Sequence, residues 1–466
     1  MRMDAQKNKN IAIIGAGIAG LTAGALLSKK GHTVTIFEKQ PILGGRAASI
    51  PGTNLTLESY QRFLKDNKCF LAFSNPPITK VFEKKLLDGY RLDLGYHAIG
   101  GGVFSNLNSV LSQFQDHIDI LESYVGFIND TTASFPFLSK KDKLLILPNI
   151  LRLLLASEKT LNKLDDISIT QTIQKYGKGK MKLILEVFSR SITTVNNLNR
   201  ISTGEMFRAQ RNLYKGSKPV GYPKNGLSSI HEMLAEIIKK YGGQIYLNTQ
   251  VEHLLIDDAT VKGIQVPGKR YSFDIVVSSV LLQELFTIAD ESWFPESYKN
   301  TLKSLTGTGS LCAYYALKDC PLDLIGKTFH FLERDVGVDG NDAVGMIDFM
   351  SAAPSAAISP KGEYLVQSYI ICTPEEAKNK HHLNTLRKLL DKNLKILIPN
   401  YGENLIFALY PSVWHLDGVA KTIDNAKPLI HTPIKHLYVI GDGVKAMGIG
   451  FNCALNSARM LVEHIL

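Results

Sequence analysis

The first 40 residues alternate short apolar runs with a segment of helical character. Residues 11–14 form one run, Ile-Ala-Ile-Ile, and residues 34–37 form another, Val-Thr-Ile-Phe. Between them lies an apolar segment that contains Leu21 and Leu26 and stops at Gly31. Apolar runs of this length next to glycine favour strands, so the pattern predicts a strand–helix–strand unit.

The turn between the first strand and the helix carries a Gly-x-Gly-x-x-Gly motif. Its first glycine permits a tight turn, its second lets backbone approach a pyrophosphate, and its third lets the helix pack on the strand. The start of the helix favours an anion through its unpaired N–H groups and its dipole. Glu38 ends the second strand and is placed to accept hydrogen bonds from a ribose. The sequence therefore predicts a dinucleotide site that includes Gly15, Ala16, Gly17, Ile18, Ala19, Gly20, Glu38 and Lys39.

Two further segments indicate the kind of dinucleotide. Residues 44–46 are Gly-Gly-Arg, in which the glycines let backbone pass close to a cofactor and the arginine offers a fork for phosphate. Residues 436–443 predict a buried strand that ends in Gly-Asp-Gly, and a helix is expected from about Asn452 to His464. Ordinary NAD dehydrogenases have no such elements.

These motifs together resemble a known family. The supporting segments are Gly15 to Glu38, 44–46, 88–97, 221–227, 242–251 and the block around Gly441-Asp442-Gly443. They resemble the FAD-dependent amine-oxidase superfamily, and within it the phytoene desaturase branch, which includes carotenoid desaturases, carotenoid isomerases and retinol saturases. The resemblance runs from one end of the chain to the other and is loose between about 290 and 430.

The resemblance implies a non-covalent FAD and additional contacts with it. Val251 would place backbone against the adenine, Asp442 would touch the ribityl or phosphate part, and the helix start near Gly448 would stabilise the reduced flavin. The further cofactor contacts that it implies are Gly44, Gly45, Arg46, Tyr96, His97, Val251, Gly441, Asp442, Gly448, Ile449 and Asn452.

Two side chains are candidates for roles beside the flavin. His97 follows Asp93 where the family's chain passes the isoalloxazine, so we consider it either a catalytic base or hydrogen-bond donor, or a histidine that fixes a loop. Trp414 either lines the substrate cavity or packs in the core.

The expected fold is α/β, with a Rossmann-like FAD-binding domain of the glutathione reductase type interleaved with a substrate domain of antiparallel sheet plus helices. Residues 245–247 together with Val251 predict one strand, 261–266 a hairpin arm and 275–277 a buried strand. Within the substrate domain, residues 311–317 and 364–371 predict strands, and 383–397 predict an amphipathic helix. The expected limits are 1–130, 216–285 and 431–466 for the FAD-binding domain, 131–215 for a helical region and 286–430 for the substrate-binding domain.

One segment departs from the family's pattern. The Gly-Gly-Arg motif and the Asp-x-Gly motif lie close together in the family, whereas here Ile50 to Leu87 intervenes. A helix and a loop near the mouth of the cofactor site are expected there. A surface excursion and a role in shaping the substrate site both remain open.

Composition and charge limit the kinds of partner that the protein is expected to bind. The net charge is +10, but the lysines are scattered and no nucleic-acid-binding motif is present, so no nucleic acid is expected. The charge instead fits solubility or attraction to an anionic membrane. Five scattered cysteines without Cys-x-x-Cys indicate reduced thiols and no metal site. Without a signal peptide or a run of 18 apolar residues, the expected location is the cytoplasm.

Residues 139–164 give the membrane expectation local support. Lys140, Lys141 and Lys143 precede an apolar cluster that extends from Leu144 to Ala156. A basic, apolar helix of this length lies in a membrane interface, as a peripheral contact, or is buried as part of the substrate domain. Both alternatives fit a lipophilic substrate.

Three classes of function compete. The first is an FAD-dependent oxidoreductase that desaturates, saturates or isomerises carbon–carbon bonds of an isoprenoid-like or carotenoid-like substrate, with an electron acceptor that the sequence does not identify. The second is an amine oxidase, which in this superfamily typically carries a lysine near the flavin N5. Residues 309–315 contain no lysine, so an amine oxidase is favoured less than the first class. The third is a non-catalytic FAD-binding protein, which no motif supports.

Overall fold

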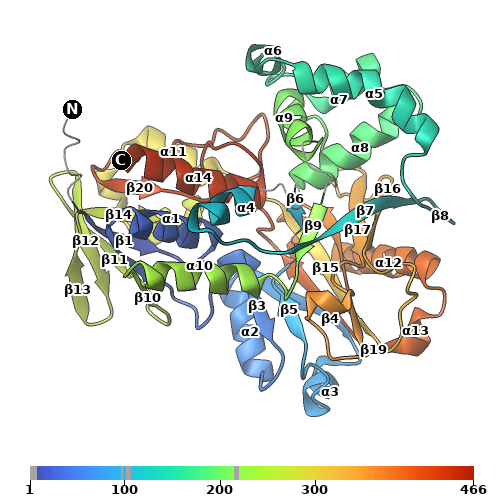
Figure 1. Ribbon diagram of the computed structural model, residues 1–466, viewed down its shortest axis with the longest axis horizontal. Coiled ribbons are helices and arrows are strands. Elements are labelled where there is room, and N and C mark those ends of the chain that lie inside the picture. Colours follow the sequence, from blue (N-terminus) through green and yellow to red (C-terminus); the bar gives the residue numbers. More distant parts are fainter. Residues whose placement is uncertain (1–7, 96–97, 101–105, 215–219, 466) are drawn as a thin grey trace.

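The computed structural model describes residues 8–95, 98–100, 106–214 and 220–465. The predicted strand–helix–strand unit is present and forms the centre of a five-stranded parallel sheet with the order β10-β2-β1-β14-β20 (Figure 1). The first three elements are β1 (Asn10–Ile14), α1 (Ile18–Lys29) and β2 (Thr33–Phe37), and the other strands are β10 (Gln244–Tyr246), β14 (Ile275–Ser278) and β20 (Leu437–Val439).

Helix α1 is buried along nearly its whole length, from Ile18 to Ser28. A helix that is apolar on all sides must be covered on all sides, and α1 packs against α10 (Ser228–Lys240) and α14 (Gly450–Ile465). The last helix of the chain therefore rests directly on the first one.

The second large element is a ten-stranded sheet with the order β4-β19-β15-β18-β17-β16-β7-β9-β6, in which β8 pairs with β7. Its pairs are antiparallel apart from β16 and β7. The nine residues of β15 are all buried, with α12 (Lys380–Leu397) packed on the sheet. The bounds are β4 (Cys69–Asn75), β6 (Ile99–Gly100), β7 (Ile120–Ile128), β8 (Ala133–Ser134), β9 (Val220–Pro223), β15 (Gly309–Leu317), β16 (Lys327–Glu333), β17 (Ala343–Asp348), β18 (Tyr364–Cys372) and β19 (Leu405–Val413).

Five helices gather beyond one end of this sheet and form a helical cap (Figure 1). Helix α8 connects the cap to the sheet through contacts with β16 and β17. Of the helices in the described part of the chain, none combines the length and the apolar content that crossing a bilayer needs. The cap helices are α5 (Lys140–Leu155), α6 (Glu158–Asn162), α7 (Ile169–Tyr176), α8 (Lys180–Thr193) and α9 (Thr203–Tyr214).

The segment 50–87 differs from the helix and loop expected there. After β3 (Ser49–Pro51) it forms α2 (Leu57–Asp66), strand β4 and α3 (Ile78–Glu83). Strand β4 pairs with β19, so it is an edge strand of the large sheet. The sequence pattern did not reveal this strand because its partner lies more than 300 residues further along the chain.

Two local predictions were wrong by a few residues. Val251 was expected in a strand with residues 245–247, but β10 ends at Tyr246. Asn248 has a φ of 50°, a left-handed conformation that a continuous strand cannot contain, and Val251 follows in the connection to β11. Helix α14 begins at Gly450, two residues before the expected Asn452.

Smaller elements complete the fold. A three-stranded antiparallel sheet, β11-β12-β13, contains the hairpin arm expected at 261–266, and β3 pairs with β5. The remaining bounds are β5 (Arg91–Asp93), β11 (His253–Asp257), β12 (Thr260–Val266), β13 (Lys269–Ser272), α4 (Asn106–Leu111), α11 (Glu296–Ser304) and α13 (Tyr401–Asn404).

The expected division into domains remains a prediction. The pairing of the strands shows where its limits would move if each sheet defined one domain. Strands β4, β6, β7 and β9 fall within the residues expected for the FAD-binding domain, yet they pair in the ten-stranded sheet.

Candidate functional site

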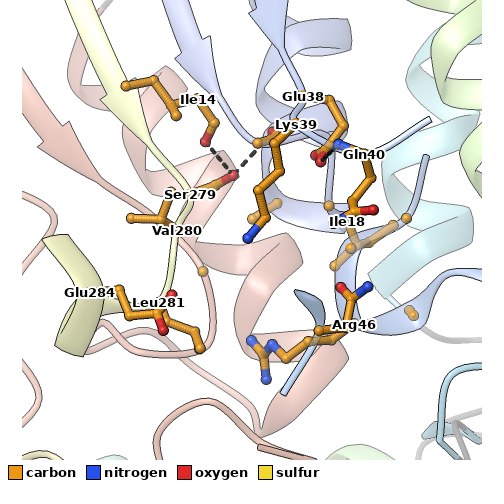
Figure 2. Close-up of a pocket in the computed structure, with 18 of the residues that line it drawn as sticks. Ile14, Ile18, Glu38, Lys39, Gln40, Arg46, Ser279, Val280, Leu281 and Glu284 are labelled. Atoms are coloured by element: carbon orange, nitrogen blue, oxygen red, sulfur yellow. Dashed lines mark hydrogen bonds between the residues drawn. The ribbon is translucent and has the colours of Figure 1, made fainter. Parts of the chain in front are cut away.

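A cavity lies at the carboxyl-terminal edge of the parallel sheet (Figure 2). Its walls include the turn after β1, the end of β2, the residues that follow β14 and β20, and the start of α14. Ligands of open α/β sheets bind outside the carboxyl ends of the strands, where loops from neighbouring strands meet. This cavity is therefore the candidate ligand site of the fold.

The glycine turn forms the centre of the cavity wall. Gly15 has a φ of +100°, and a Cβ atom on Gly20 would overlap the Gly15 carbonyl oxygen, so both glycines are required by the turn itself. A Cβ atom on Gly17 would have the Gly44 oxygen, 3.9 Å away, as its nearest neighbour. The fold leaves this space open on the side of the cavity, as a close approach of a ligand requires.

The first turn of α1 is open to an anion. Its N-cap residue is Gly17, which has no side chain to accept hydrogen bonds from the first N–H groups of the helix. Gly17, Ile18 and Ala19 all line the cavity. The N–H groups at the start of a helix lack partners within the helix, and the helix dipole adds positive charge there. The turn thus offers the donors that a phosphate needs.

Glu38 holds this turn against the end of β2. Only 5% of the residue is exposed, and its carboxylate accepts the Ala16 N–H at 2.7 Å and the Gln40 N–H at 2.8 Å. Each carboxylate oxygen keeps a further lone pair for a ligand hydroxyl. Glu38 therefore supports the glycine turn as well as lining the cavity.

The Gly-Gly-Arg motif packs against the first glycine motif. The Gly44 N–H donates to the Ala16 carbonyl at 2.9 Å, and a Cβ atom on Gly45 would lie 3.3 Å from the Gly17 Cα. Gly44 and Gly45 both have positive φ, at 113° and 56°. Two motifs that are about 30 residues apart in the sequence thus form one continuous backbone surface.

Arg46 and Asp442 form an ion pair at the cavity wall. Arg46 Nη1 lies 3.0 Å from Asp442 Oδ2, and Arg46 Nη2 lies 2.5 Å from Asp442 Oδ1. The Gly418 N–H also donates to Asp442 Oδ2 at 2.7 Å. Burial alone would raise the pKa of Asp442, but the Arg46 guanidinium outweighs burial and holds this pKa below its ordinary value.

A second buried carboxylate, Asp417, lies beside this pair. Burial and, to a smaller extent, the negative charge of Asp442 together raise its pKa to about 6. Asp417 Oδ2 accepts the Thr194 hydroxyl at 2.9 Å, and a Cβ atom on Gly450 would lie 2.7 Å from Asp417 Oδ1. Asp417 therefore connects the end of α8 with the first residue of α14.

Most of the residues that the sequence predicted for the site line this cavity. They are Gly15, Gly17, Ile18, Ala19, Glu38, Lys39, Gly44, Gly45, Arg46, Val251, Gly441 and Asp442. Their contacts with a cofactor remain predictions, because lining a cavity does not show what fills it.

Other predicted residues lie elsewhere. Ala16 and Gly20 belong to the glycine turn but do not line the cavity. Gly448 and Ile449, which precede α14, and Asn452, which lies within it, do not line the cavity either. Gly450, Phe451 and Ala454 line it instead. Tyr96 and His97 lie outside the described residues.

Trp414 does not line the cavity. Its ring packs near Phe70 of β4, with ring centroids 6.0 Å apart, and Lys378 Nζ lies 5.2 Å from the centre of the Trp414 ring. A role for Trp414 toward a substrate remains a prediction.

Several lining residues were missed by sequence reasoning. Ser279 and Leu281 follow the predicted buried strand 275–277, so the rule for the carboxyl ends of parallel strands could have found them. Asp66, Asn67 and Lys68 come from the inserted segment, and Asp417 from a long loop. No local pattern marks these four.

The chain matches the family of flavin-containing amine oxidoreductases over residues 18–466. An uncharacterised protein of Methanocaldococcus jannaschii is 28% identical over 457 residues, which cover 94% of each chain. A 4,4'-diapophytoene desaturase (4,4'-diapolycopene-forming) of Methylomonas sp. is 26% identical over 290 residues, which cover 55% of this chain and 50% of the desaturase. The chain thus matches about half the length of that desaturase.

Among solved structures, an oxidoreductase from Methanosarcina mazei superposes with a TM-score of 0.73 and 22% identity, covering 97% of this chain and 99% of the other. This likeness shows the same α/β fold, with a parallel sheet and a large mixed sheet. The family match extends over nearly the whole chain. The chain therefore belongs to the flavin-containing amine oxidoreductase family, whose members typically bind FAD.

Proposed function

We propose that this protein is a flavoenzyme with non-covalent FAD that acts on carbon–carbon bonds of a lipophilic, isoprenoid-like substrate. The proposal of FAD as the cofactor rests on the continuous backbone surface, or cradle, that the two glycine motifs form at the edge of the parallel sheet. The substrate part is supported by the likeness to a diapophytoene desaturase and by the surface of the helical cap.

The residues present fit FAD. The open space at Gly17 and the uncapped start of α1 suit a pyrophosphate, and Glu38 suits a ribose. Arg46 and Asp442 provide a donor and an acceptor further along the cavity. FAD, when bound, supplies the ring that accepts or returns a hydride, while the protein supplies binding, orientation and electrostatics.

The start of α14 provides the positive end of a helix dipole at one end of the cavity, through Gly450 and Phe451. Negative charge that develops near a helix N-terminus is stabilised there. Asp417 lies beside the same helix start and, with a pKa near 6, holds a proton at its carboxyl group in mildly acidic solution. These groups would orient a flavin and set the charge that surrounds it.

The exposed apolar face of helix α5 supports the proposal of a lipophilic substrate. Leu144, Leu147, Leu151 and Leu155 are all exposed and share one face of the helix, with Leu144 at 71% and Leu155 at 84% exposure. Ile146, on another face, is buried against Ile184 of α8. Lys140, Lys141 and Lys143 at the start of α5 are exposed as well.

An exposed apolar stripe with lysines at one end is typical of a helix that lies in a membrane interface. We therefore include a peripheral contact with an anionic membrane in the proposal. A hydrocarbon substrate would then move from the bilayer to the enzyme without full exposure to water. An apolar path from α5 to the flavin remains a prediction, since no described residue between 131 and 215 lines the cavity.

Amine oxidation is the second candidate, because the family's description names amine oxidoreductases. The resemblance assigns to β15 the lysine that amine oxidases typically carry near the flavin, and the sequence of β15, Gly-Ser-Leu-Cys-Ala-Tyr-Tyr-Ala-Leu, contains none. This observation favours the carbon–carbon alternative.

The test begins with the purified protein. We expect a yellow protein that releases free FAD when it is denatured, and a lipid extract from its host that reduces the bound flavin without oxygen. Mass spectrometry should then show a polyene that has lost the two hydrogens that reduced the flavin, whereas an isomer of unchanged mass, formed without net reduction of the flavin, would indicate isomerisation. The Gly17→Val variant, expected to lack flavin, is the matched control. Reduction by primary amines and not by the extract would favour the second candidate instead.

A further inference from the structure

The turn between α2 and β4 contributes a side of the cavity that the family's motifs do not include. Asp66, Asn67 and Lys68 line the cavity together with Glu284, which lies in the helical turn Leu282–Thr287. Lys68 Nζ and Glu284 Oε1 are 2.9 Å apart. An ion pair between the inserted segment and the residues after β14 therefore lies at the cavity.

The backbone of this turn is firmly held. A capping box of Thr56 and Ser59 begins α2, and the apolar face of α2 is buried. The Asn67 side-chain amide donates to the Phe63 carbonyl at 2.8 Å, and the backbone N–H of Trp414 donates to the Lys68 carbonyl at 3.2 Å. Since β4 continues the turn into the large sheet, the backbone of Lys68 is held in place.

The ion pair itself is weak. The Lys68 side chain is 42% exposed and that of Glu284 is 33% exposed, so water screens their attraction. The other two cations of the lining have nearby acceptors, since Arg46 pairs with Asp442 and Lys39 Nζ lies 3.5 Å from the Asp66 carbonyl. Figure 2 shows Lys39 and Arg46 on one side of the cavity and Glu284 on the other. Because the Lys68–Glu284 pair is screened by water, an anion in the cavity can compete with Glu284 for Lys68.

We propose that Lys68 is an anion-binding residue of the cavity, which leaves Glu284 and contacts a phosphate of the dinucleotide when the dinucleotide binds. This inference rests on the proposed function, because FAD supplies the phosphates. A pyrophosphate carries more charge than one carboxylate, so it competes effectively for an ammonium group. Glu284 opposes binding, because it holds Lys68 in the free protein and adds negative charge to the cavity.

The proposal gives opposite signs for two substitutions of one ion pair. Lys68→Met should weaken FAD binding to the apoprotein about tenfold, as expected for a charge-assisted contact. Glu284→Gln should tighten it about threefold, because it frees Lys68. Lys65→Met removes the same charge from an exposed position on α2 that does not line the cavity, and should change the affinity less than about twofold.

The measurement is titration of apoprotein with FAD at low and high salt, together with the melting temperature of each apoprotein. Lys68→Met should also weaken the salt dependence of binding, since one fewer charge contact is screened. If the ion pair only braces the turn, both variants will bind FAD more weakly and melt earlier, and the proposal is overturned. Equal binding by wild type and Lys68→Met overturns it too. A wild-type protein that binds no FAD overturns the proposed function along with this inference.

Discussion

The cofactor cavity and the outer face of α5 present two different kinds of surface. In the cavity, backbone packs on backbone, as Gly17 and Gly45 show, and Glu38 is nearly buried with its carboxylate hydrogen-bonded to two backbone N–H groups. On α5, leucine and lysine side chains project from a regular helix, and Leu155 is 84% exposed.

This difference predicts how substitutions affect binding at each surface. A ligand that lies directly against backbone leaves no space for an added side chain, so single substitutions in the cradle should abolish ligand binding. An apolar stripe binds through the sum of several side chains, so its loss should be gradual.

Gly17→Val should abolish FAD binding and leave the protein folded. The added side chain has room within the protein, since the nearest atom to a Cβ at this position is 3.9 Å away, but it fills the space that a pyrophosphate needs. We expect affinity to fall more than about a hundredfold, the size of a steric block at a close contact. Flavin content per protein and the melting temperature of the apoprotein measure the two effects.

Gly20→Val is the contrasting variant, because its side chain would overlap the Gly15 carbonyl and should lower stability as well. Full flavin occupancy in Gly17→Val would show that the cradle is not the cofactor site.

The double substitution Leu144→Asp/Leu155→Asp should lower binding to anionic vesicles more than about tenfold, because each leucine contributes roughly 1.5–3 kcal/mol when it leaves water. Flavin content should not change, since neither residue lines the cavity. Vesicle flotation at low salt measures the effect. Leu322→Asp, at a leucine that is 77% exposed outside the cap, is the control. Wild-type protein that does not float would contradict the membrane contact.

Glu38→Ala should weaken the contrast, because here a side chain supports the backbone cradle. Loss of its carboxylate leaves the Ala16 and Gln40 N–H groups without their acceptor and should lower the free energy of unfolding by about 2–3 kcal/mol. FAD affinity should fall as well. Denaturant unfolding of the apoprotein distinguishes this variant from Gly17→Val, and Glu236→Ala, at an exposed glutamate of α10, serves as control. Unchanged stability would mean that the turn holds itself.

Asp417 should produce the smallest effect, a change in the pH dependence of stability. Burial raises its pKa in the folded protein to about 6, whereas the unfolded chain titrates near 4, so the folded state binds more protons between these values. Its contribution to the free energy of unfolding therefore falls as pH rises from about 4 to 6, by about 1–3 kcal/mol.

Asp442, whose pKa is lowered, behaves oppositely and loses its contribution only below pH 4. The difference in unfolding free energy between wild type and Asp417→Asn isolates the first effect. Parallel pH curves for the two proteins would show that Asp417 does not titrate in this window.

The fold was predictable wherever neighbouring residues determine the structure. The strand–helix–strand unit, the buried strands at 275–277 and 311–317 and the long helix at 383–397 all appear where apolar patterns predicted them. The edge strand β4 was not predictable, because its place depends on β19.

The candidate site follows the same division. Many glycines and acids of the short motifs line the cavity, and their contacts with a cofactor remain predictions, whereas Lys68 and Asp417 reach the cavity through turns and loops whose course depends on tertiary packing. Gly448 to Asn452 were predicted to face the flavin ring, and this remains a prediction. Of these residues, Gly450 and Phe451 line the cavity, together with Ala454 one turn further along α14.

The packing of α14 on α1 has a consequence for the order of events in the cell. Gly441, Asp442 and Gly450 complete the cavity only after more than 400 residues have been translated beyond the glycine turn. The nascent chain must therefore hold the apolar faces of α1 and β1 without the helix that covers one side of them. For the proposed flavoenzyme, capture of FAD would then be a late step of maturation, and flavin supply would determine how much newly made protein reaches its stable form.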